Sequence, residues 1–334
     1  AGTFTASTGT CSIVQVPITI VAVWYNLPPG FTVAPYETVA SYSTSPTAIG
    51  ASLTFRARAT DFNASYYLII CSSNSVTAGA SGAAPTCGAT TYCTSSATAS
   101  GSYATCSYTT SSGDAWSNAW YAFVCDNNSS DPKCSSANQG SGNSGSPFYV
   151  NDPPTFSNIT ITDSSQNPTE SVQWNATASD SDGNTVKLLV CKTNAMSSGS
   201  CTGGAWCTSS LSTSNPSCSY TIPTPTPDGS YDAWVYVVDQ FNLGASGTGT
   251  KQGSESDFTV NNVAPVVSSV ALNSGNAILL NENTTTQIQL SATVTDANGC
   301  GSEIPSVLGY VYRSGISFTG CDTLAEANQN YCYP

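Results

Sequence analysis

The sequence lacks histidine, and it has one methionine and only seven lysines and arginines among its 334 residues. Charged residues make up 8% of the chain, and the formal net charge is −13 at pH 7. A chain this acidic does not attract nucleic acid or anionic membranes electrostatically, so we expect neither as a partner. Without histidine, the usual base for a serine or cysteine nucleophile is missing.

Other catalytic signatures are also absent from the sequence. It has no glycine-rich phosphate loop and no G-x-S-x-G turn, and its few glutamates, such as Glu170 and Glu282, are dispersed. We therefore expect no enzymatic activity and no cofactor. The most apolar stretch, residues 10–33, is interrupted by Gln15 and Pro17, so no run reaches the ~20 apolar residues of a transmembrane helix.

Fourteen cysteines stand out against this low charge. Paired C-x-x-C spacings, which zinc sites commonly use, do not occur. A chain rich in cysteine, serine and glycine is typical of an oxidising compartment. We therefore predict disulfides and an extracellular or cell-surface location.

Three internal repeats determine the predicted architecture. Each contains an alternating apolar segment that ends in aspartate: LTFRARATD (residues 53–61), VQWNATASD (172–180) and IQLSATVTD (288–296). A second apolar segment follows in each repeat, and then an aromatic-cysteine step at Cys93, Cys207 or Cys332. Short alternating segments with polar turns and no helical period predict an all-β protein of tandem immunoglobulin-like antiparallel β-sandwiches.

The two ends of the chain read as parts of one further repeat. The third repeat lacks counterparts of the two closing strands, so it should expose an apolar face and unpaired strand edges. At the N-terminus, Cys11 sits in a Thr-Cys-Ser step, and residues 18–26 match the segments that end at Asp126 and Asp239. Phe31-Thr32-Val33 matches a closing strand at 258–260. The interval from this cysteine to the proline linker is only about half as long as in the full repeats.

The predicted organisation therefore has four parts. Proline-marked linkers separate them. In chain order they are a donor segment (1–35), two complete immunoglobulin-like domains (36–153 and 154–264) and an incomplete acceptor domain (265–334). The donor segment would complete the acceptor domain of a second copy through an intersubunit contact. The residues predicted at this contact are Cys11, Ile18, Ile20, Val23, Phe31, Val33 and Cys332.

Neighbouring cysteines within each repeat give the most economical set of disulfides. The predicted pairs are Cys71–Cys87, Cys93–Cys106, Cys125–Cys134, Cys191–Cys201, Cys207–Cys218 and Cys300–Cys321. Cys332 is then left to pair with Cys11 of another copy, at the positions of Cys207 and Cys218. Alternatively, Cys11 pairs with Cys300 in the same chain or stays free.

Two further features have competing interpretations. Asp180, Asp182 and Asn184 form a weak calcium candidate, but Asp-Gly between strands is also a common hairpin turn, which we favour. Six Asn-x-Ser/Thr sequons predict glycan attachment if the source organism glycosylates such sites. These asparagines are Asn63, Asn127, Asn128, Asn158, Asn175 and Asn283. The tryptophans lie in or beside strand patterns, so we expect them in the core rather than in a sugar-binding platform.

The repeats resemble immunoglobulin-like and PKD-like tandem modules of prokaryotic cell-surface or extracellular filament proteins. The resemblance rests on NATASDSDGN at residues 175–184, the following VKLLVCKTN, the aromatic-cysteine steps and the V-N-x-x-P linkers. It implies a stalk, an adhesin or a filament subunit.

The two partial repeats favour a pilus-like homopolymer that grows head to tail by donor-strand complementation. The alternatives are a fragment of a cell-surface adhesin or stalk, and accessory β-modules of a secreted glycan-active enzyme.

Overall fold

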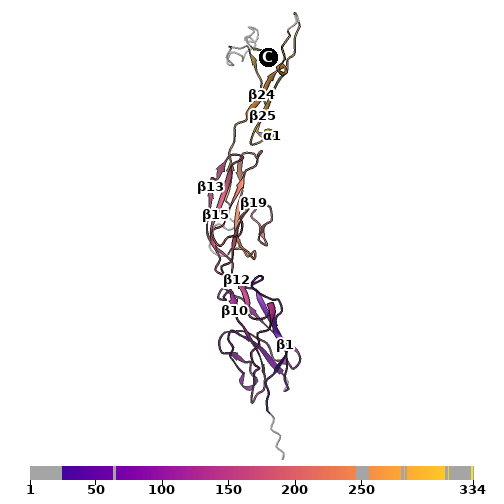
Figure 1. The fold of residues 1–334 in the computed structure, drawn as a ribbon, viewed down its shortest axis with the longest axis vertical. Helices are drawn as coiled ribbons and strands as arrows, with labels where there is room; N and C mark the ends of the chain where they lie inside the picture. The colour runs from indigo at the N-terminus through magenta and orange to yellow at the C-terminus, as the bar shows by residue number, and fades with distance from the viewer. Residues whose placement is uncertain are drawn as a thin grey trace, which may run out of the picture. The chain divides into compact units, whose positions relative to one another are not determined.

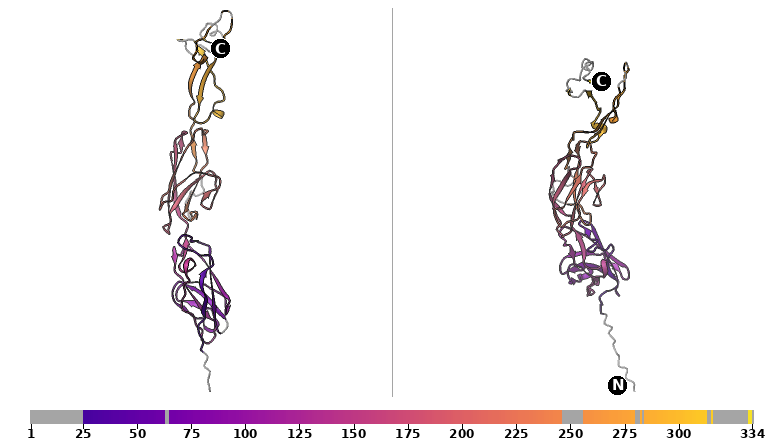
Figure 2. Two further views of the ribbon diagram at one scale, coloured as in Figure 1. Left: turned by 45° about the vertical axis from the view of Figure 1, so that its right-hand side comes forward. Right: turned by 45° about the horizontal axis from the view of Figure 1, so that its top comes forward.

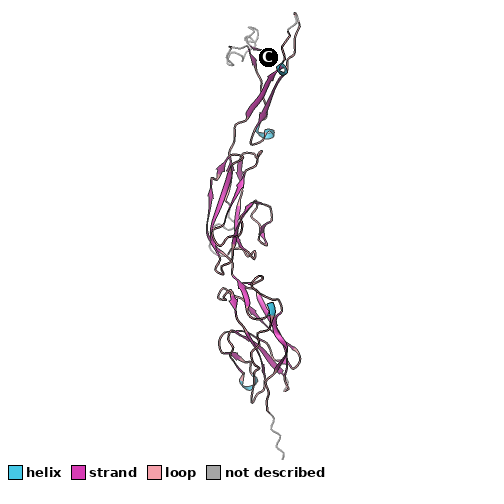
Figure 3. Ribbon diagram, viewed as in Figure 1, coloured by secondary structure: helices cyan, strands magenta, loops and turns pink. Residues whose placement is uncertain are grey.

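The computed structural model describes residues 25–62, 65–245, 256–279, 282, 284–312, 315 and 332–333. Strands dominate the described part, and its helical segments are short turns such as α1 (Cys300–Glu303) (Figure 3). The prediction of an all-β fold is confirmed. The chain divides into two compact units, the first within residues 1–44, 51–110 and 117–149, and the second within 45–50, 111–116 and 150–334.

The first unit is a β-sandwich of two antiparallel sheets. One sheet has the order β1–β3–β9, with bounds Gly30–Glu37, Ser52–Thr60 and Tyr103–Thr109. The other has the order β11–β4–β7, with bounds Tyr121–Asp126, Ser65–Cys71 and Thr91–Thr94, and β8 (Thr98–Ala99) also pairs with β4. This division of strands between two sheets is that of an immunoglobulin-like sandwich.

A closing strand, β12 (Phe148–Asn151), completes this sandwich. It pairs antiparallel with β10 (Ser117–Asn118) and parallel with β2 (Thr47–Ala48). Phe148 is fully buried, and its ring lies 6.2 Å from that of Phe55, which contacts the Trp120 ring at 5.3 Å. The closing strand therefore supplies a central part of the aromatic core.

The second unit contains a sandwich with the same plan. Its sheets have the orders β13–β15–β20 and β19–β16–β22, with bounds Thr155–Thr162, Ser171–Ser179, Ser217–Thr221, Ala205–Thr208, Val186–Cys191 and Trp234–Asp239 (Figure 1). The closing strand β23 (Phe258–Val260) pairs parallel with β14 (Ser165–Gln166) and antiparallel with β21 (Gly229–Tyr231).

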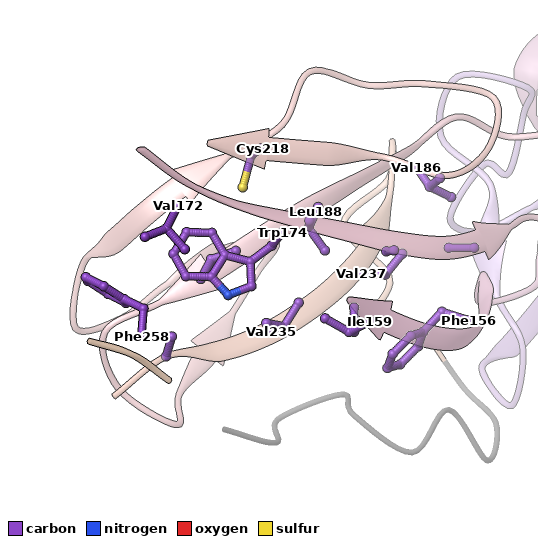
Figure 4. Close-up of a cluster of buried hydrophobic side chains, with 14 of the residues drawn as sticks. Phe156, Ile159, Val172, Trp174, Val186, Leu188, Cys218, Val235, Val237 and Phe258 are labelled. Atoms are coloured by element: carbon purple, nitrogen blue, oxygen red, sulfur yellow. The ribbon is translucent and has the colours of Figure 1, made fainter. Parts of the chain in front are cut away.

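The core of this second sandwich is centred on Trp174. Figure 4 shows its indole among Val172, Leu188, Val235 and Phe258. Trp174 is fully buried, and its ring lies 5.8 Å from that of Phe258 in an edge-to-face arrangement. Residues from both sheets and from the closing strand thus share one core.

The continuous apolar runs of β4 and β16 have a separate explanation. On β4, Ile69 and Cys71 pack with Phe123 and Cys125 in a second small cluster, which the disulfide-bearing loops cover with Cys87 and other half-buried residues. An equivalent cluster on β16 contains Leu189 and Cys191. Both faces of these strands are therefore buried, so their sequences do not alternate.

The structure corrects the predicted start of the first domain. Residues 36–43 were expected to open it, but β1 begins at Gly30, and Phe31 pairs with Ala59 as Phe156 pairs with Ala178 in the second sandwich. Phe31 and Val33 therefore lie in the opening strand of their own chain and not in the closing strand of a donor segment. Sequence identity to Phe-Thr-Val misled the prediction, because strand pairing fixes the register.

The C-terminal part of the second unit contains two isolated strand pairs. The longer pair joins β24 (Val266–Leu272) to β25 (Leu290–Thr295), and the shorter joins β26 (Val311–Tyr312) to β27 (Cys332–Tyr333). Figure 2 shows β24 and β25 as a two-stranded ribbon in orange.

The structure contains five disulfides, which are five of the six pairs set out above. They join Cys71–Cys87, Cys93–Cys106, Cys125–Cys134, Cys191–Cys201 and Cys207–Cys218. Cys207 lies in β19 and Cys218 in β20, so this bond links the two sheets of the second sandwich. Cys300 is free and exposed, while Cys321 lies outside the described residues, so their pairing stays a prediction.

Replacing Cys207 and Cys218 together by serine should lower the free energy of unfolding of the second sandwich by about 3 kcal/mol, because a closed loop of this size restrains the unfolded chain. Urea unfolding followed by tryptophan fluorescence measures the change. Asn158→Ala, at an exposed position on β13, is the control and should leave the urea midpoint unchanged. Equal midpoints for the double variant and the control would contradict a role for the cross-sheet bond.

Candidate functional site

The β24–β25 pair exposes apolar side chains whose equivalents are buried in the second sandwich. Val267 pairs with Val294 as Phe156 pairs with Ala178, yet Val267 is 56% exposed and Phe156 only 5%. Val270 is 65% exposed, whereas Ile159, at the same distance from the start of its strand, is 2% exposed. The inward face of this pair thus lies open in the single chain.

The same difference holds for β25. Leu290 occupies the place of Trp174, counted back from the aspartate that ends each repeat's alternating segment. Leu290 is 39% exposed and Trp174 is fully buried. In the second sandwich, the closing strand covers Trp174 with Phe258. Among the described residues, no strand takes the place of β23 over Leu290.

An asparagine before each Pro-Pro linker forms a hydrogen bond to the sandwich that follows that linker. In the second unit, Asn151 at the end of β12 donates from Nδ2 to Asp239 Oδ2 at 2.6 Å. Asn184 Nδ2 donates to Asn151 Oδ1 at 2.7 Å. The linker residue Asn151 is therefore satisfied by two side chains of the second sandwich, and both Asn151 and Asp239 are buried.

The first unit repeats this contact. Asn26 Nδ2 donates to Asp126 Oδ2 at 2.6 Å, and Asp126 ends β11 as Asp239 ends β22. Each asparagine also stands two residues before a Pro-Pro step, at residues 28–29 and 153–154. Asn26 is therefore the equivalent of Asn151, the last residue of a closing strand. The predicted match of residues 18–26 to the strands that end at Asp126 and Asp239 is wrong at Asn26.

Burial raises the pKa of Asp239, while hydrogen bonds from Asn151 and from the backbone N–H groups of Leu243 and Phe241 lower it. Those N–H groups each donate to Asp239 Oδ1 at 2.8 Å. The carboxyl group is fully buried and depends on these donors, because an unpaired buried carboxylate is costly.

Residues 180–184 form a turn between the two sheets of the second sandwich. It connects β15 to β16, so it is not the hairpin turn expected from Asp-Gly. Gly183 has φ +76°, and Asp182 N–H donates to Asp180 Oδ1 at 2.8 Å. Asp182 Oδ2 accepts from Asp152 N–H at 2.7 Å, which fixes the linker.

In the calcium candidate, Asp180, Asp182 and Asn184 each use one oxygen in a hydrogen bond within the protein, and the other oxygen of Asp180 is buried without a hydrogen-bond partner. Calcium binding at this turn stays a prediction. In the described part of the chain, no group of three or more histidine, cysteine, aspartate or glutamate side chains is arranged to hold a metal ion.

The other predicted sites are distributed as follows. Asn158 is exposed on β13, Asn175 is half-buried on β15, and Asn127 and Asn128 follow β11. Asn63 and Asn283 lie outside the described residues, as do the donor residues Cys11, Ile18, Ile20 and Val23. The backbone of Cys332 pairs with that of Tyr312. Trp120 and Trp174 are fully buried, as expected for core tryptophans.

No protein-family model and no curated protein sequence matches this chain. Solved structures that resemble it contain immunoglobulin-like domains. The titin I-band fragment I67–I69 is 12% identical, with 86% of this chain and 85% of that chain covered at a TM-score of 0.37. The Yersinia pseudotuberculosis adhesin InvE is 11% identical, with coverages of 69% and 58% and a TM-score of 0.24. No function is inferred from these similarities. None of the helices in the described part of the chain has the length and apolarity to span a bilayer.

Asn151→Ala should lower the free energy of unfolding of the second sandwich by about 1–3 kcal/mol, because it leaves the buried Asp239 carboxylate without its side-chain donor. Thermal unfolding by calorimetry measures the loss. Asn158→Ala, at an exposed position on β13, is the control and should change stability by less than about 0.5 kcal/mol. Equal melting temperatures for the two variants would show that the Asn151 contact adds no stability.

Two carboxyl groups give the protein a predictable pH dependence. Burial raises the pKa of Glu37 from 4.5 to about 7, although Ser41 donates to its Oε2 from N–H at 2.8 Å and from Oγ at 2.6 Å. Burial likewise raises the pKa of Asp180 from 3.8 to about 6. Each group therefore keeps its proton to a higher pH in the folded chain than in the unfolded chain. Between the unfolded and folded pKa of each group, the folded state binds more protons than the unfolded state.

We expect these two groups to contribute most to the free energy of unfolding below about pH 4. Their contribution should fall as the pH rises from about 4 to 7. Glu37→Gln should remove the part due to Glu37, about 3 kcal/mol, and so stabilise the first sandwich near pH 7. Urea unfolding at pH 4.5 and pH 7 measures this. Glu170→Gln, at an exposed position, serves as the control. A steeper pH dependence in Glu37→Gln than in the wild type would contradict the assignment.

Proposed function

We propose that this protein is an extracellular structural subunit that polymerises head to tail by donor-strand complementation. The supporting observation is the open inward face of β24–β25, where Val267, Val270 and Leu290 are exposed although their equivalents are buried. An apolar face with unpaired edges favours association with a strand from elsewhere. The strand would come from the N-terminal donor segment of a second copy of this chain.

The register of the donated strand follows from Asn26. Because Asn26 is the equivalent of Asn151, residues 23–25 take the places of 148–150 in β12. Phe148 and Val150 point into the core, so Val23 and Tyr25 would enter the acceptor, and Trp24 would face outward. Tyr25 is 81% exposed in the single chain, whereas its equivalent Val150 is 1% exposed.

Pairing partners for this strand are present in the acceptor domain. In the second sandwich, β23 pairs parallel with β14, which follows β13. The corresponding stretch after β24 contains the exposed Ile278 and Leu279. The donated strand would run parallel to this stretch, with Val21 on the same face as Val23, and with Ile18 and Ile20 on the opposite face.

An intersubunit disulfide would make the contact covalent. By its aromatic-cysteine step, Cys332 matches Cys93 and Cys207, which bond to Cys106 and Cys218. Cys11 lies in the same Cys-Ser step as those partners. Cys11 of one copy would therefore bond to Cys332 of the next. The proposed subunit is not catalytic, and glycans at the sequons would cover its outer faces.

Purified wild-type protein should give a ladder of integer multiples of the 34.3 kDa chain on non-reducing electrophoresis, and the ladder should collapse on reduction. Cys332→Ser should abolish the ladder but leave non-covalent filaments visible by electron microscopy. Val23→Asp with Tyr25→Asp should abolish both, because two charges would enter the apolar acceptor face.

Val39→Asp is the matched control, since Val39 is 79% exposed within the first unit, and it should polymerise like the wild type. Monomers alone at all concentrations would refute the proposal and favour a stalk or adhesin fragment. Polymers that persist in the Val23→Asp, Tyr25→Asp variant would show that another contact drives assembly.

A further inference from the structure

The outer face of the β1–β3–β9 sheet carries a concentration of positive charge that the rest of the chain lacks. Arg56 and Arg58 are two of only seven basic residues, and they alternate with the buried Phe55, Ala57 and Ala59 on β3. Alternate residues on a strand share one face and lie about 7 Å apart. The two guanidinium groups are therefore neighbours on one sheet surface.

Tyr103 holds these arginines in place. Tyr103 is the first residue of β9 and pairs with Arg58 of β3. Its ring centroid lies 4.1 Å from the guanidinium carbon of Arg56 and 5.9 Å from that of Arg58. The Tyr103 side chain is 40% exposed. A guanidinium stacked on an aromatic ring keeps its edge available for hydrogen bonds in its own plane.

Neither arginine is neutralised within the described part of the chain, where the one ion pair joins Lys133 to Asp131. Arg56 Nε is buried and has no hydrogen-bond partner there, so a ligand would bind the two terminal nitrogens of this guanidinium. The equivalent outward positions in the second sandwich are the uncharged Asn175 and Thr177. The arginine pair is thus specific to the first sandwich and has no structural counterion.

The surroundings of the pair are mostly hydroxyl groups. Thr105 pairs with Arg56, and Thr54 Oγ1 and Ser107 Oγ lie 3.0 Å apart next to it on the same face. On the other side of the pair, β1 places Tyr36 opposite Arg56 and Val33 opposite Arg58, and both side chains are half-buried. The surface therefore combines hydroxyl groups, tyrosine rings and two guanidinium groups. It provides hydrogen bonds for sugar hydroxyls and paired donors for an oxyanion.

The net charge of −13 gives no long-range attraction for a polyanion, so binding here would depend on local contacts. We propose that this face binds an acidic polysaccharide, with Arg56 and Arg58 each holding a carboxylate or sulfate group of the polymer. The planar guanidinium binds both oxyanions through two parallel hydrogen bonds, so the shared chemistry is an oxyanion on a saccharide chain. This proposal is independent of the polymerisation proposed above.

The test uses the full-length protein and three polymers: polygalacturonate for carboxylate, dextran sulfate for sulfate, and neutral dextran. Isothermal titration should show binding to at least one acidic polymer and not to dextran, and the affinity should fall as salt rises. The Arg56→Gln, Arg58→Gln variant should lose about tenfold or more in affinity. Tyr103→Ala should lose less, because it frees the Arg56 guanidinium without removing it.

Lys187→Gln with Lys192→Gln is the charge-matched control in the second sandwich and should bind within twofold of the wild type. Unchanged thermal unfolding of each variant shows that the fold is intact. Failure to bind either acidic polymer would overturn the proposal. An equal loss in the lysine control would also overturn it, because the binding would then depend on net charge and not on the arginine pair.

Discussion

Each sandwich depends on its closing strand, because that strand supplies the last wall of a core shared by two sheets. In the first unit, Phe148 contacts Phe55, which in turn contacts the fully buried Trp120, and in the second Phe258 contacts Trp174. Each closing strand also pairs with a short parallel strand, β2 or β14. Removing such a strand leaves apolar surface and unpaired backbone groups exposed together. In the proposed filament, that combined cost would give a donated strand its binding energy.

Among the described residues of the C-terminal part, no closing strand covers the β24–β25 pair. Val267 and Leu290 are exposed on β24–β25, although the strands themselves are paired in the same register as β13–β15. Strand pairing is thus a local property, whereas burial needs a second layer. The filament proposal follows from this separation between pairing and burial.

Polar contacts fix the linkers to the sandwiches as hydrophobic packing cannot. Asn151 binds Asp239 and Asn184 in a buried position, where polar groups need partners, and the half-buried Asn26 binds the buried Asp126. The same contacts define which residue ends each closing strand. These hydrogen bonds therefore determine the register of the closing strands. An apolar sequence pattern alone does not, because many β-branched segments fit a strand equally well.

The sequence by itself determined the all-β sandwich class, the position of most strands and the five intradomain disulfides, because alternation and cysteine order are local properties of the chain. It failed at Phe31, at Asn26 and at the turn of residues 180–184, where the outcome depends on which strand lies alongside. Only the tertiary structure placed Phe31 opposite Ala59, joined Asn26 to Asp126 and stacked Arg56 on Tyr103. These contacts link residues far apart in sequence, and packing between strands selects them rather than local preference.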